Sequence, residues 1–357
     1  MTAAMTDILR PEISALHAYH VPPASGFLKL DAMENPYDLP AELQAELGRR
    51  LATAPINRYP DPQGSGIKAG LKTALAIPDG FEVLLGNGSD EIIQLLAMLV
   101  MKPGATILSV EPSFVMYKMI ATFCGLNYVG VPLDADDFSL DLDATLAAIQ
   151  QHQPALVFLA YPNNPTGNAF DAKAIETIIE AAPGLVVVDE AYHAFAEDSF
   201  FSRLSRYPNL VVMRTLSKLG LAGLRLGFIV GSSQWITELD KLRLPYNINV
   251  LTQVATELAL EHIDVLNGQA ETLKLERASL FGALNALPGV TAFPSQANFI
   301  LARVPDATRV FNELKTRKIL IKNLHGGAKV LDNCLRFTVG RPEDNAVVIA
   351  ALKEILQ

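Results

Sequence analysis

The sequence predicts an α/β protein with a mostly parallel sheet, helices on both of its faces, and a smaller α+β domain after it. Between about residue 81 and residue 230, short runs rich in Val, Ile and Leu alternate with amphipathic stretches of helical period. After Pro245 the pattern changes to a long helical stretch followed by short strands. The chain has 357 residues, which is more than a single core usually serves, so two domains are expected.

The apolar runs have the length and composition of buried strands. They lie at residues 81–85, 106–110, 126–131, 155–160, 185–188, 210–214 and 225–230. Helical patterns separate them, most clearly at residues 90–101, 142–150 and 172–181. Because strands joined through helices run parallel and are covered on both faces, this alternation predicts a seven-stranded type of sheet.

The C-terminal part has a different pattern. Residues 252–286 predict one or two long helices, residues 297–303 and 335–339 predict strands, and residues 308–317 and 344–356 predict two further helices. The irregular segment 31–37 is expected to dock on this part. We therefore expect an N-terminal segment (1–40), a large cofactor-binding domain (41–245) and a small C-terminal domain (246–357).

Composition and charge exclude several classes of function. The net charge is −9 and no dense Lys/Arg patch is present, which argues against a nucleic-acid partner. Cys124 and Cys334 are far apart in apolar surroundings, so they read as core thiols and no metal site is expected. The first ten residues lack a signal-peptide pattern, and the longest apolar run, residues 95–101, is far shorter than the roughly 20 residues of a membrane helix. We therefore expect a cytoplasmic protein that does not bind membranes.

Polar residues follow several of the predicted strands, where ligands bind in such sheets. Gly88, Ser89 and Asp90 open the helix after the first strand, and free N–H groups at a helix start attract anions. A capped strand-to-helix turn explains the same residues. After the strand at 155–160, two prolines bracket Asn163 and Asn164, which either fixes a side-chain amide in one direction or simply makes a rigid turn.

Two further strand ends carry ionisable residues. The run at 185–188 ends in Asp189, a carboxylate that is costly to bury unless a cation or metal pairs with it; a structural ion pair is the alternative. Lys218 follows the strand at 210–214, with Thr215 and Ser217 beside it and Arg225 a few residues later. Lys218 is either a desolvated nucleophile beside a phosphate site or an ordinary solvated lysine.

One ligand would satisfy all four strand ends. It has an anionic group, a cationic ring nitrogen, a hydrogen-bonded oxygen and a carbonyl that an amine can capture. Pyridoxal 5′-phosphate has each of these features. A single shared site explains the four positions better than four independent structural accounts.

The chain resembles the fold type I pyridoxal-phosphate enzymes, and among them the histidinol-phosphate aminotransferase family. The resemblance runs from residues 30–36 (Leu-Asp-Ala-Met-Glu-Asn-Pro) to residues 335–340 (Leu-Arg-Phe-Thr-Val-Gly). It implies that Lys218 binds the cofactor covalently and that Asp189 pairs with the protonated ring nitrogen. It also implies that Asn164 and Tyr192 bind the phenolic oxygen.

The same resemblance assigns the cofactor phosphate to the loop and hydroxyl residues Gly88, Ser89, Asp90, Thr215 and Ser217, together with Arg225. Phe114 is similar to the aromatic residue that stacks on the ring, with plain core packing as the alternative. Tyr59 is similar to a tyrosine that reaches the cofactor phosphate of the other subunit in a dimer. A merely buried surface tyrosine is the competing account.

On the substrate side, Arg336 matches an arginine that holds an α-carboxylate by a two-point contact, with a structural ion pair as the alternative. The resemblance also places Tyr19 and Asn35 near the substrate. Two positions depart from the family pattern. Met33 stands where asparagine is usual. Lys322 stands where relatives commonly have an arginine that helps to bind the substrate phosphate, so the charge is kept but the fork is lost.

The resemblance implies a homodimer that transfers an amino group between histidinol phosphate and 2-oxoglutarate, giving imidazole-acetol phosphate and glutamate in histidine biosynthesis. Three other activities use similar residues: an aminotransferase for aromatic or other amino acids, a decarboxylase of a phosphorylated amino acid, and a cofactor-binding regulator. A regulator of this fold carries an additional DNA-binding domain, for which the chain has neither the length nor the basic charge.

Overall fold

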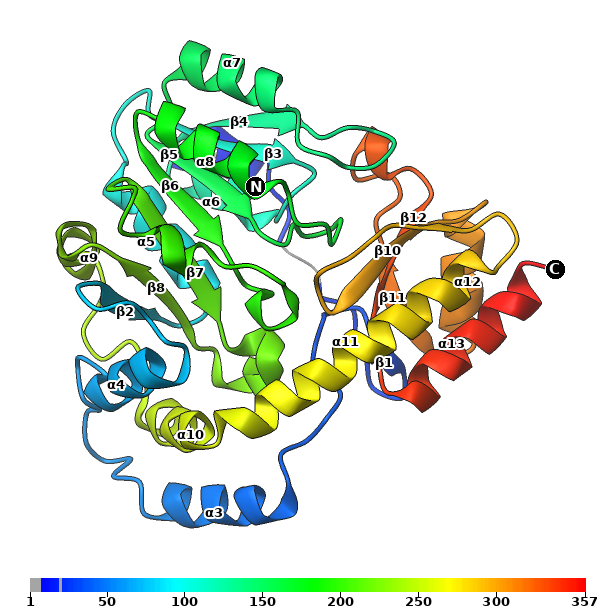
Figure 1. Ribbon diagram of the computed structural model, residues 1–357, viewed down its shortest axis with the longest axis horizontal. Helices are drawn as coiled ribbons and strands as arrows, with labels where there is room; N and C mark the ends of the chain where they lie inside the picture. The colour runs from blue at the N-terminus through cyan, green and yellow to red at the C-terminus, as the bar shows by residue number, and fades with distance from the viewer. Residues whose placement is uncertain (1–7, 19–20) are drawn as a thin grey trace.

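A computed structural model describes residues 8–18 and 21–357. Figure 1 shows a large sheet with its helices beside a smaller sheet with its own helices, and helix α11 (Ile263–Asn285) runs from one part to the other. This arrangement confirms the predicted fold class: a mostly parallel sheet followed by a smaller α+β part.

Within the described residues, the large sheet has seven strands in the order β2-β8-β7-β6-β5-β3-β4. Their bounds are β2 Glu82–Gly86, β3 Thr106–Glu111, β4 Asn127–Pro132, β5 Leu156–Ala160, β6 Leu185–Asp189, β7 Leu210–Thr215 and β8 Gly227–Gly231. Neighbouring strands are parallel except at β8, which runs antiparallel to both β2 and β7. The carboxyl ends of β5, β6 and β7 therefore lie at one edge of the sheet.

One predicted strand begins later than expected. The run at residues 225–230 was expected to be extended from Arg225, but β8 starts at Gly227. Arg225 has a φ of 52°, which lies in the left-handed region and cannot continue a strand. The hydrophobic pattern did not reveal this turn because Arg225 stands between two apolar residues, Leu224 and Leu226, which continue the apolar run.

Helices cover both faces of the large sheet because successive strand residues point to opposite sides. Leu84, Ile107 and Val187 belong to one apolar cluster, and their strand neighbours Leu85 and Leu108 belong to the other. The first cluster includes residues of α5 (Ser89–Leu99), α6 (Met116–Phe123) and α9 (Ser233–Asp240). The second includes residues of α4 (Ser65–Ala74), α7 (Leu142–His152) and α8 (Ala172–Ala181).

The small sheet has the strand order β1-β11-β12-β10-β9. Its strands are β1 Leu28–Leu30, β9 Thr291–Ala292, β10 Phe299–Arg303, β11 Ile319–Asn323 and β12 Cys334–Thr338, and its helices include α12 Ala307–Thr316 and α13 Pro342–Ile355. The predicted helical stretch 252–286 forms two helices, α10 (Val250–Glu261) and α11, which meet at His262. Strands β1, β9 and β11 were not predicted; β1 and β9 have only three and two residues, and β1 pairs with residues far along the chain.

The segment that follows β1 contacts the small sheet and the helix after it. The backbone N–H of Met33 donates to Oγ1 of Thr338 (3.1 Å), and Nδ2 of Asn298 donates to the Met33 carbonyl (3.0 Å). The guanidinium of Arg341 donates twice to the carbonyl of Pro36. Met33 itself has a φ of 54°, so these contacts hold a bend that a non-glycine residue rarely adopts.

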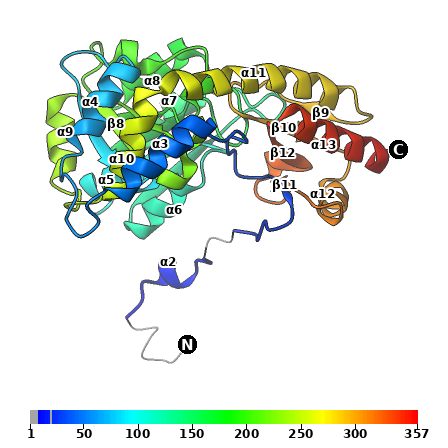
Figure 2. The ribbon, with the colours of Figure 1, turned by 90° about the horizontal axis from the view of Figure 1, so that it is seen from below.

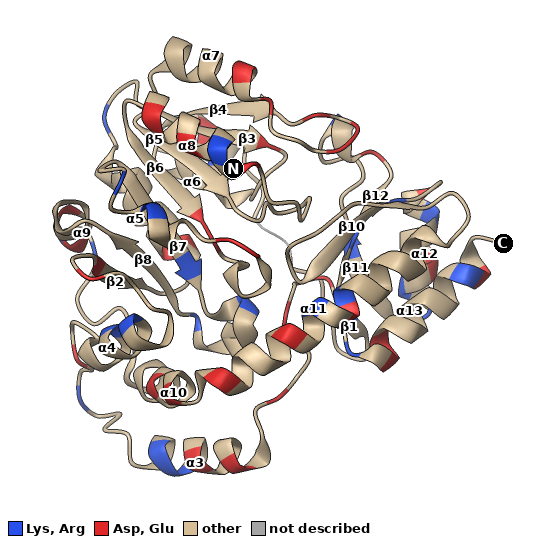
Figure 3. Cartoon of the chain, viewed as in Figure 1, with Lys and Arg blue, Asp and Glu red and all other residues tan. Residues whose placement is uncertain are grey.

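Before β1, helix α2 (Pro11–Ser14) lies away from the two sheets, as Figure 2 shows, and Arg10 donates to the carbonyl of Phe123 at the end of α6. After the bend, α3 (Ala41–Ala52) and α4 pack against α10. Lys/Arg and Asp/Glu residues are interspersed on both parts of the molecule (Figure 3). Among the described helices, none has the length and apolar character needed to cross a membrane.

Candidate functional site

A cavity lies beyond the carboxyl ends of β5, β6 and β7, where ligands bind in sheets of this topology. Its lining combines the three strand ends with the start of α5 and the bend after β1. The lining residues are Met33, Ser89, Asp90, Phe114, Ala160, Pro162, Asn164, Asp189, Ala191, Tyr192, Thr215, Ser217, Lys218 and Arg225. The structure thus brings together most of the cofactor-site residues that the sequence suggested.

Asp189 ends β6 and is 4% exposed. Its Oδ2 accepts from the hydroxyl of Tyr117 (2.6 Å) and its Oδ1 accepts from the backbone N–H of Ala191 (3.1 Å). Burial raises the pKa of Asp189 to about 6, and these two hydrogen bonds oppose the rise. Among the residues that the structure describes, no basic side chain lies within ion-pair distance of Asp189, so a cationic group of a ligand would be its partner.

The neighbouring carboxylate has the opposite environment. Glu190 forms a buried ion pair with Arg214 (2.8 Å) and also accepts from the backbone N–H of Phe200 and the hydroxyl of Ser199. Arg214 lies on the ring of Phe201, 3.7 Å from the ring centroid. The structural ion pair that was the alternative for Asp189 is therefore made by Glu190, and it ties the ends of β6 and β7 together.

Lys218 lies in the turn Ser217–Leu221 that follows β7. Its Nζ donates to the carbonyl of Ala32 (3.0 Å), in the bend after β1. Burial lowers the pKa of Lys218 to about 8, and the positive charges of Arg336 and Arg225 contribute to this shift. A lysine in this setting has a sizeable neutral fraction near neutral pH, as a nucleophilic amine requires.

Several donors surround one corner of the cavity. Gly88 has a φ of 83° and precedes α5, so the first N–H groups of that helix are left without helical acceptors. The hydroxyls of Thr215 and Ser217 lie 2.9 Å apart at the end of β7. Arg225 extends from its left-handed turn toward this corner, with Nη2 3.5 Å from Oδ2 of Asp90. Unpaired N–H groups, hydroxyls and a guanidinium are the groups that bind a phosphate.

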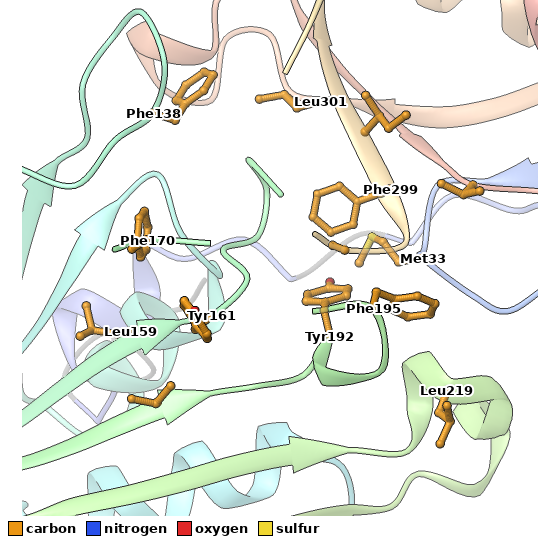
Figure 4. Close-up of a cluster of buried hydrophobic side chains, with 14 of the residues drawn as sticks. Met33, Phe138, Leu159, Tyr161, Phe170, Tyr192, Phe195, Leu219, Phe299 and Leu301 are labelled. Carbon is orange, nitrogen blue, oxygen red and sulfur yellow. The ribbon is translucent and has the colours of Figure 1, made fainter. Parts of the chain in front are cut away.

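On the other side of the cavity, the side chain of Arg336 on β12 donates to Oδ1 of Asn164 (2.5 Å) and to the carbonyl of Asp31 (3.0 Å). Because Oδ1 of Asn164 is occupied, its Nδ2 remains as a donor. Figure 4 shows Tyr192 facing Phe299 and Met33 where the two sheets meet, and burial raises the pKa of the Tyr192 hydroxyl. Asn164 and Tyr192 therefore supply two hydrogen-bond donors to the same cavity.

Asn163, the other asparagine of this loop, has a structural role. Its Nδ2 donates to the carbonyl of Pro112 (3.0 Å) and to Oγ1 of Thr166 (2.7 Å), and its Oδ1 accepts from the hydroxyl of Ser113 (2.8 Å). These bonds join the loop after β5 to the turn after β3. That turn carries Phe114, so Asn163 also fixes the backbone beside an aromatic residue of the cavity wall.

Of the described residues that the resemblance proposed, five are not among the lining residues: Gly88, Arg336, Tyr59, Asn35 and Lys322. Gly88 directly precedes Ser89 of the lining, and Arg336 contacts Asn164 of the lining. Tyr59 is 80% exposed and stacks on Tyr246, with ring centroids 4.4 Å apart. Asn35 donates to the carbonyl of Leu219 and to Gln269, and thereby supports the turn that carries Lys218. Lys322 lies opposite Arg336 in the β11–β12 register. Tyr19 lies outside the described residues.

The sequence reasoning did not propose the lining residues Met33, Ala160, Pro162 and Ala191, or Tyr117 as the partner of Asp189. Met33 was noted only as a departure from a family pattern, and nothing local signals its left-handed backbone. Tyr117 stands three residues after Phe114 on an amphipathic helix, where an aromatic side chain reads as core.

The described side chains fit pyridoxal 5′-phosphate. A buried carboxylate without a cationic partner suits the ring nitrogen, two donors suit the phenolic oxygen, and an amine of lowered pKa suits the aldehyde. The corner at Ser89, Ser217 and Arg225 suits the phosphate.

Comparison with known proteins gives a family match over almost the whole chain. The family model for class I and II aminotransferases matches residues 25–352. A histidinol-phosphate aminotransferase from Chromobacterium violaceum is 57% identical over 353 residues, which is 99% of each chain. Histidinol-phosphate aminotransferase 1 from Ralstonia nicotianae is 55% identical over 98% of this chain and 95% of the relative.

Solved structures share the fold at lower identity. Histidinol-phosphate aminotransferase from Sinorhizobium meliloti, in complex with pyridoxal-5′-phosphate, has a TM-score of 0.87 at 24% identity and covers 98% of this chain and 97% of its own. L-threonine-O-3-phosphate decarboxylase from Porphyromonas gingivalis has a TM-score of 0.78 at 22% identity, covering 92% and 98%. At these identities the likeness concerns the fold alone, and one fold serves both chemistries.

Proposed function

Because the chain belongs to the class I and II aminotransferase family, we propose that it transfers the amino group of histidinol phosphate to 2-oxoglutarate, with pyridoxal 5′-phosphate as its cofactor. The observation that carries the proposal is one cavity that joins a lysine of lowered pKa, a buried carboxylate without a cation and a cluster of phosphate-binding donors. The reaction belongs to histidine biosynthesis, and the proposal places it in the cytoplasm.

Bound pyridoxal 5′-phosphate supplies an aldehyde that captures amines and a ring that withdraws electrons. Lys218 provides the amine that meets this aldehyde, because burial keeps part of its Nζ neutral at working pH. Once the substrate amine has displaced it, the same Nζ would be free to take the proton from the substrate Cα and to deliver it to the carbon that was the cofactor aldehyde. Lys218 thus acts first as an attachment point and then as a base.

Asp189 and two hydrogen-bond donors would hold the cofactor ring. The carboxylate of Asp189 is ionised above about pH 6, so at neutral pH it would accept a hydrogen bond from a protonated ring nitrogen and keep the proton there. Because Arg336 occupies Oδ1 of Asn164, the Nδ2 of Asn164 would donate to the phenolic oxygen of the cofactor. Tyr192 stays protonated because burial raises its pKa, and its hydroxyl would donate to the same phenolic oxygen.

The substrate groups are matched by two basic residues of the small sheet. Arg336 is a rigid fork suited to the α-carboxylate of 2-oxoglutarate. Histidinol phosphate lacks that carboxylate and carries a phosphate. Lys322 lies directly opposite Arg336 on the neighbouring antiparallel strand, and residues paired in this way point to the same side of a sheet. We assign the substrate phosphate to this pair of cations.

The experiment that tests the substrate follows cofactor absorbance during single half-reactions with histidinol phosphate and with phenylalanine. Lys322→Ala is expected to lower the rate over affinity for histidinol phosphate by about tenfold or more, because a charged contact is lost, and to leave phenylalanine within a factor of about two. Lys315→Ala on α12 is the matched control, since Lys315 is an exposed lysine of the same small part. Equal losses for both donors would favour an aromatic aminotransferase.

The same assay separates transamination from decarboxylation. A decarboxylase acting on threonine phosphate would release carbon dioxide and return the cofactor to its starting spectrum, whereas an aminotransferase leaves it in the amine form until 2-oxoglutarate is added. Release of carbon dioxide from added threonine phosphate, together with no amine form after addition of histidinol phosphate, would overturn the proposal.

A homodimer is part of the proposal. Two contacting segments carry the exposed apolar side chains Ile56, Tyr59, Leu244, Tyr246 and Leu251. Tyr59 stacks on Tyr246, and Arg243 donates to the carbonyl of Pro62, so the segments form one surface. Exposed apolar surfaces of this kind are typical of subunit interfaces. A second subunit packed here would bring its Tyr59 toward a neighbouring cofactor phosphate, as the resemblance implies.

A further inference from the structure

Tyr117 is a buried tyrosine whose only polar group faces Asp189. It is 0% exposed and its hydroxyl donates to Oδ2 of Asp189 at 2.6 Å. Its ring stacks on Phe158 of β5, with centroids 4.5 Å apart and planes at 7°. Phe114, in the cavity wall, meets the same ring edge-on at 5.6 Å. Tyr117 therefore contacts two walls of the cavity without lining it.

The hydroxyl is not needed to fill space. The ring packs between α6 and the sheet among the side chains of a fully apolar cluster, where phenylalanine has nearly the same shape. A buried hydroxyl costs free energy unless it has a partner, and its partner here is the carboxylate that we assign to the ring nitrogen. The hydrogen bond is therefore the feature that a tyrosine adds at this position.

The two hydrogen bonds to Asp189 hold its carboxylate in one orientation. The Ala191 N–H binds Oδ1 from the turn after β6, and Tyr117 binds Oδ2 from α6. Since the donors come from different elements, rotation of the carboxylate breaks at least one bond. The remaining lone pairs are then directed to the cavity.

We propose that Tyr117 is a positioning residue, which orients Asp189 toward the cofactor ring nitrogen and keeps this carboxylate ionised at neutral pH. The inference rests on the proposed use of pyridoxal 5′-phosphate. It adds to that function a residue that touches neither cofactor nor substrate and acts through Asp189 and Phe114.

The charges around Asp189 show why such a donor matters. Burial raises the pKa of Asp189, and the carboxylates of Asp90 on α5 and Glu190 beside it raise it further. Glu190 is itself paired with Arg214, so its influence is partly cancelled. The hydrogen bonds from Tyr117 and Ala191 lower the pKa of Asp189. Tyr192 and Tyr128, the other tyrosines whose charge would act on Tyr117, stay neutral because burial raises their pKa values.

The test measures cofactor affinity of the cofactor-free protein between pH 5 and pH 9, by titration with pyridoxal 5′-phosphate. Affinity should fall as the pH drops and Asp189 takes up a proton. In Tyr117→Phe the midpoint of this fall should move up by about one pH unit, the size expected for a hydrogen bond to a charged group. Below both midpoints the variant then binds about tenfold more weakly.

Tyr207→Phe is the matched control. Tyr207 is also a buried tyrosine whose hydroxyl donates to a carboxylate, that of Glu176 at 3.1 Å, but it is remote from the cavity. The midpoint of Tyr207→Phe should equal that of the wild type. Lys218 and the cofactor phosphate also titrate, but they do so equally in all three proteins, so the difference between midpoints does not depend on them. A midpoint for Tyr117→Phe that equals the wild-type value, in a folded protein, would overturn the inference.

A second measurement covers the case in which Tyr117→Phe does not fold. Wild-type protein is labelled with fluorotyrosine, whose more acidic phenol donates a stronger hydrogen bond to Asp189. This stronger bond should lower the pH midpoint of cofactor binding. Labelled Tyr207→Phe should show the same downward shift. An unchanged midpoint would again count against the inference. Failure of the proposed function would give another result. Histidinol phosphate would then give no half-reaction in the wild type, while the midpoint of Tyr117→Phe would still lie above that of the wild type.

Discussion

At the scale of single residues, the buried charge of Asp189 lowers the stability of the cofactor-free protein. An ionised carboxylate without a cation is unfavourable in a buried site. The raised pKa of Asp189, about 6, reflects this unfavourable free energy in the cofactor-free protein. The folded pKa lies above the value near 3.8 expected when the chain is unfolded. Stability is therefore lost as the pH rises through about 4 to 6, and the loss is complete above that window.

We expect cofactor-free Asp189→Asn to gain stability relative to cofactor-free wild type as the pH increases. The difference in unfolding free energy should grow by about 2 kcal/mol between pH 4 and pH 8, because only the wild type carries the buried charge. Urea unfolding at several pH values measures it. With pyridoxal 5′-phosphate present the order should reverse. A difference that does not vary with pH would show that Asp189 is not ionised in the free protein.

At the scale of elements, the phosphate corner depends on the close approach of β8 to the start of α5. A Cβ placed on Gly227 would lie 2.7 Å from the backbone N of Ser89, so no side chain fits there without moving the helix start. The left-handed turn at Arg225 then brings its guanidinium to the same corner. Two elements that are far apart in sequence thus form one corner whose donors fit an anion.

Gly227→Ala should displace this corner and weaken pyridoxal 5′-phosphate binding by about tenfold or more, since several N–H contacts to the phosphate are lost. Binding of pyridoxal, which has no phosphate, should change by less than about twofold. Gly223→Ala in the same connection is the control, because a Cβ there meets nothing within 4 Å. Equal losses for both forms of the cofactor would mean that the substitution disturbs the whole cavity and not the phosphate corner.

At the scale of the whole molecule, the proposed homodimer would complete the site with Tyr59 of a second subunit. In one chain Tyr59 is exposed on the apolar surface with Tyr246. We therefore expect subunits of Lys218→Ala and Tyr59→Ala to complement each other when they are mixed and refolded at limiting cofactor. In a mixed dimer one site has both defects, and the other has an intact Lys218 and an intact Tyr59 from the partner.

Random pairing of the two variants should restore about a quarter of the wild-type sites, above the activity of either variant alone. Half-reaction amplitude with histidinol phosphate counts those sites. A mixture of Lys218→Ala with Asp189→Asn is the control, because both residues line the cavity of one chain. Each site of its mixed dimers therefore keeps one defect, which the partner subunit cannot replace. If the Tyr59 mixture stays at the level of its components, Tyr59 acts within its own chain or not at all.

The sequence by itself determined the sheet and the position of the cavity. Apolar runs of strand length alternate with helical patterns, and parallel strands place their carboxyl ends at one edge, so Asn164, Asp189 and Lys218 had to lie near one another. These are consequences of local periodicity and connection rules. The chemistry at each strand end could be read without knowing which side chains pack around it.

Only the tertiary structure decided which partners those residues have. Asp189 meets Tyr117, while the ion pair expected as its alternative belongs to Glu190 and Arg214. Arg225 leaves the strand predicted for it, and Met33 enters the cavity through a left-handed bend held by the small sheet. Each of these depends on contacts between elements that are distant in the chain, and backbone strain or a hydrogen-bond partner of this kind is set by packing and not by local sequence.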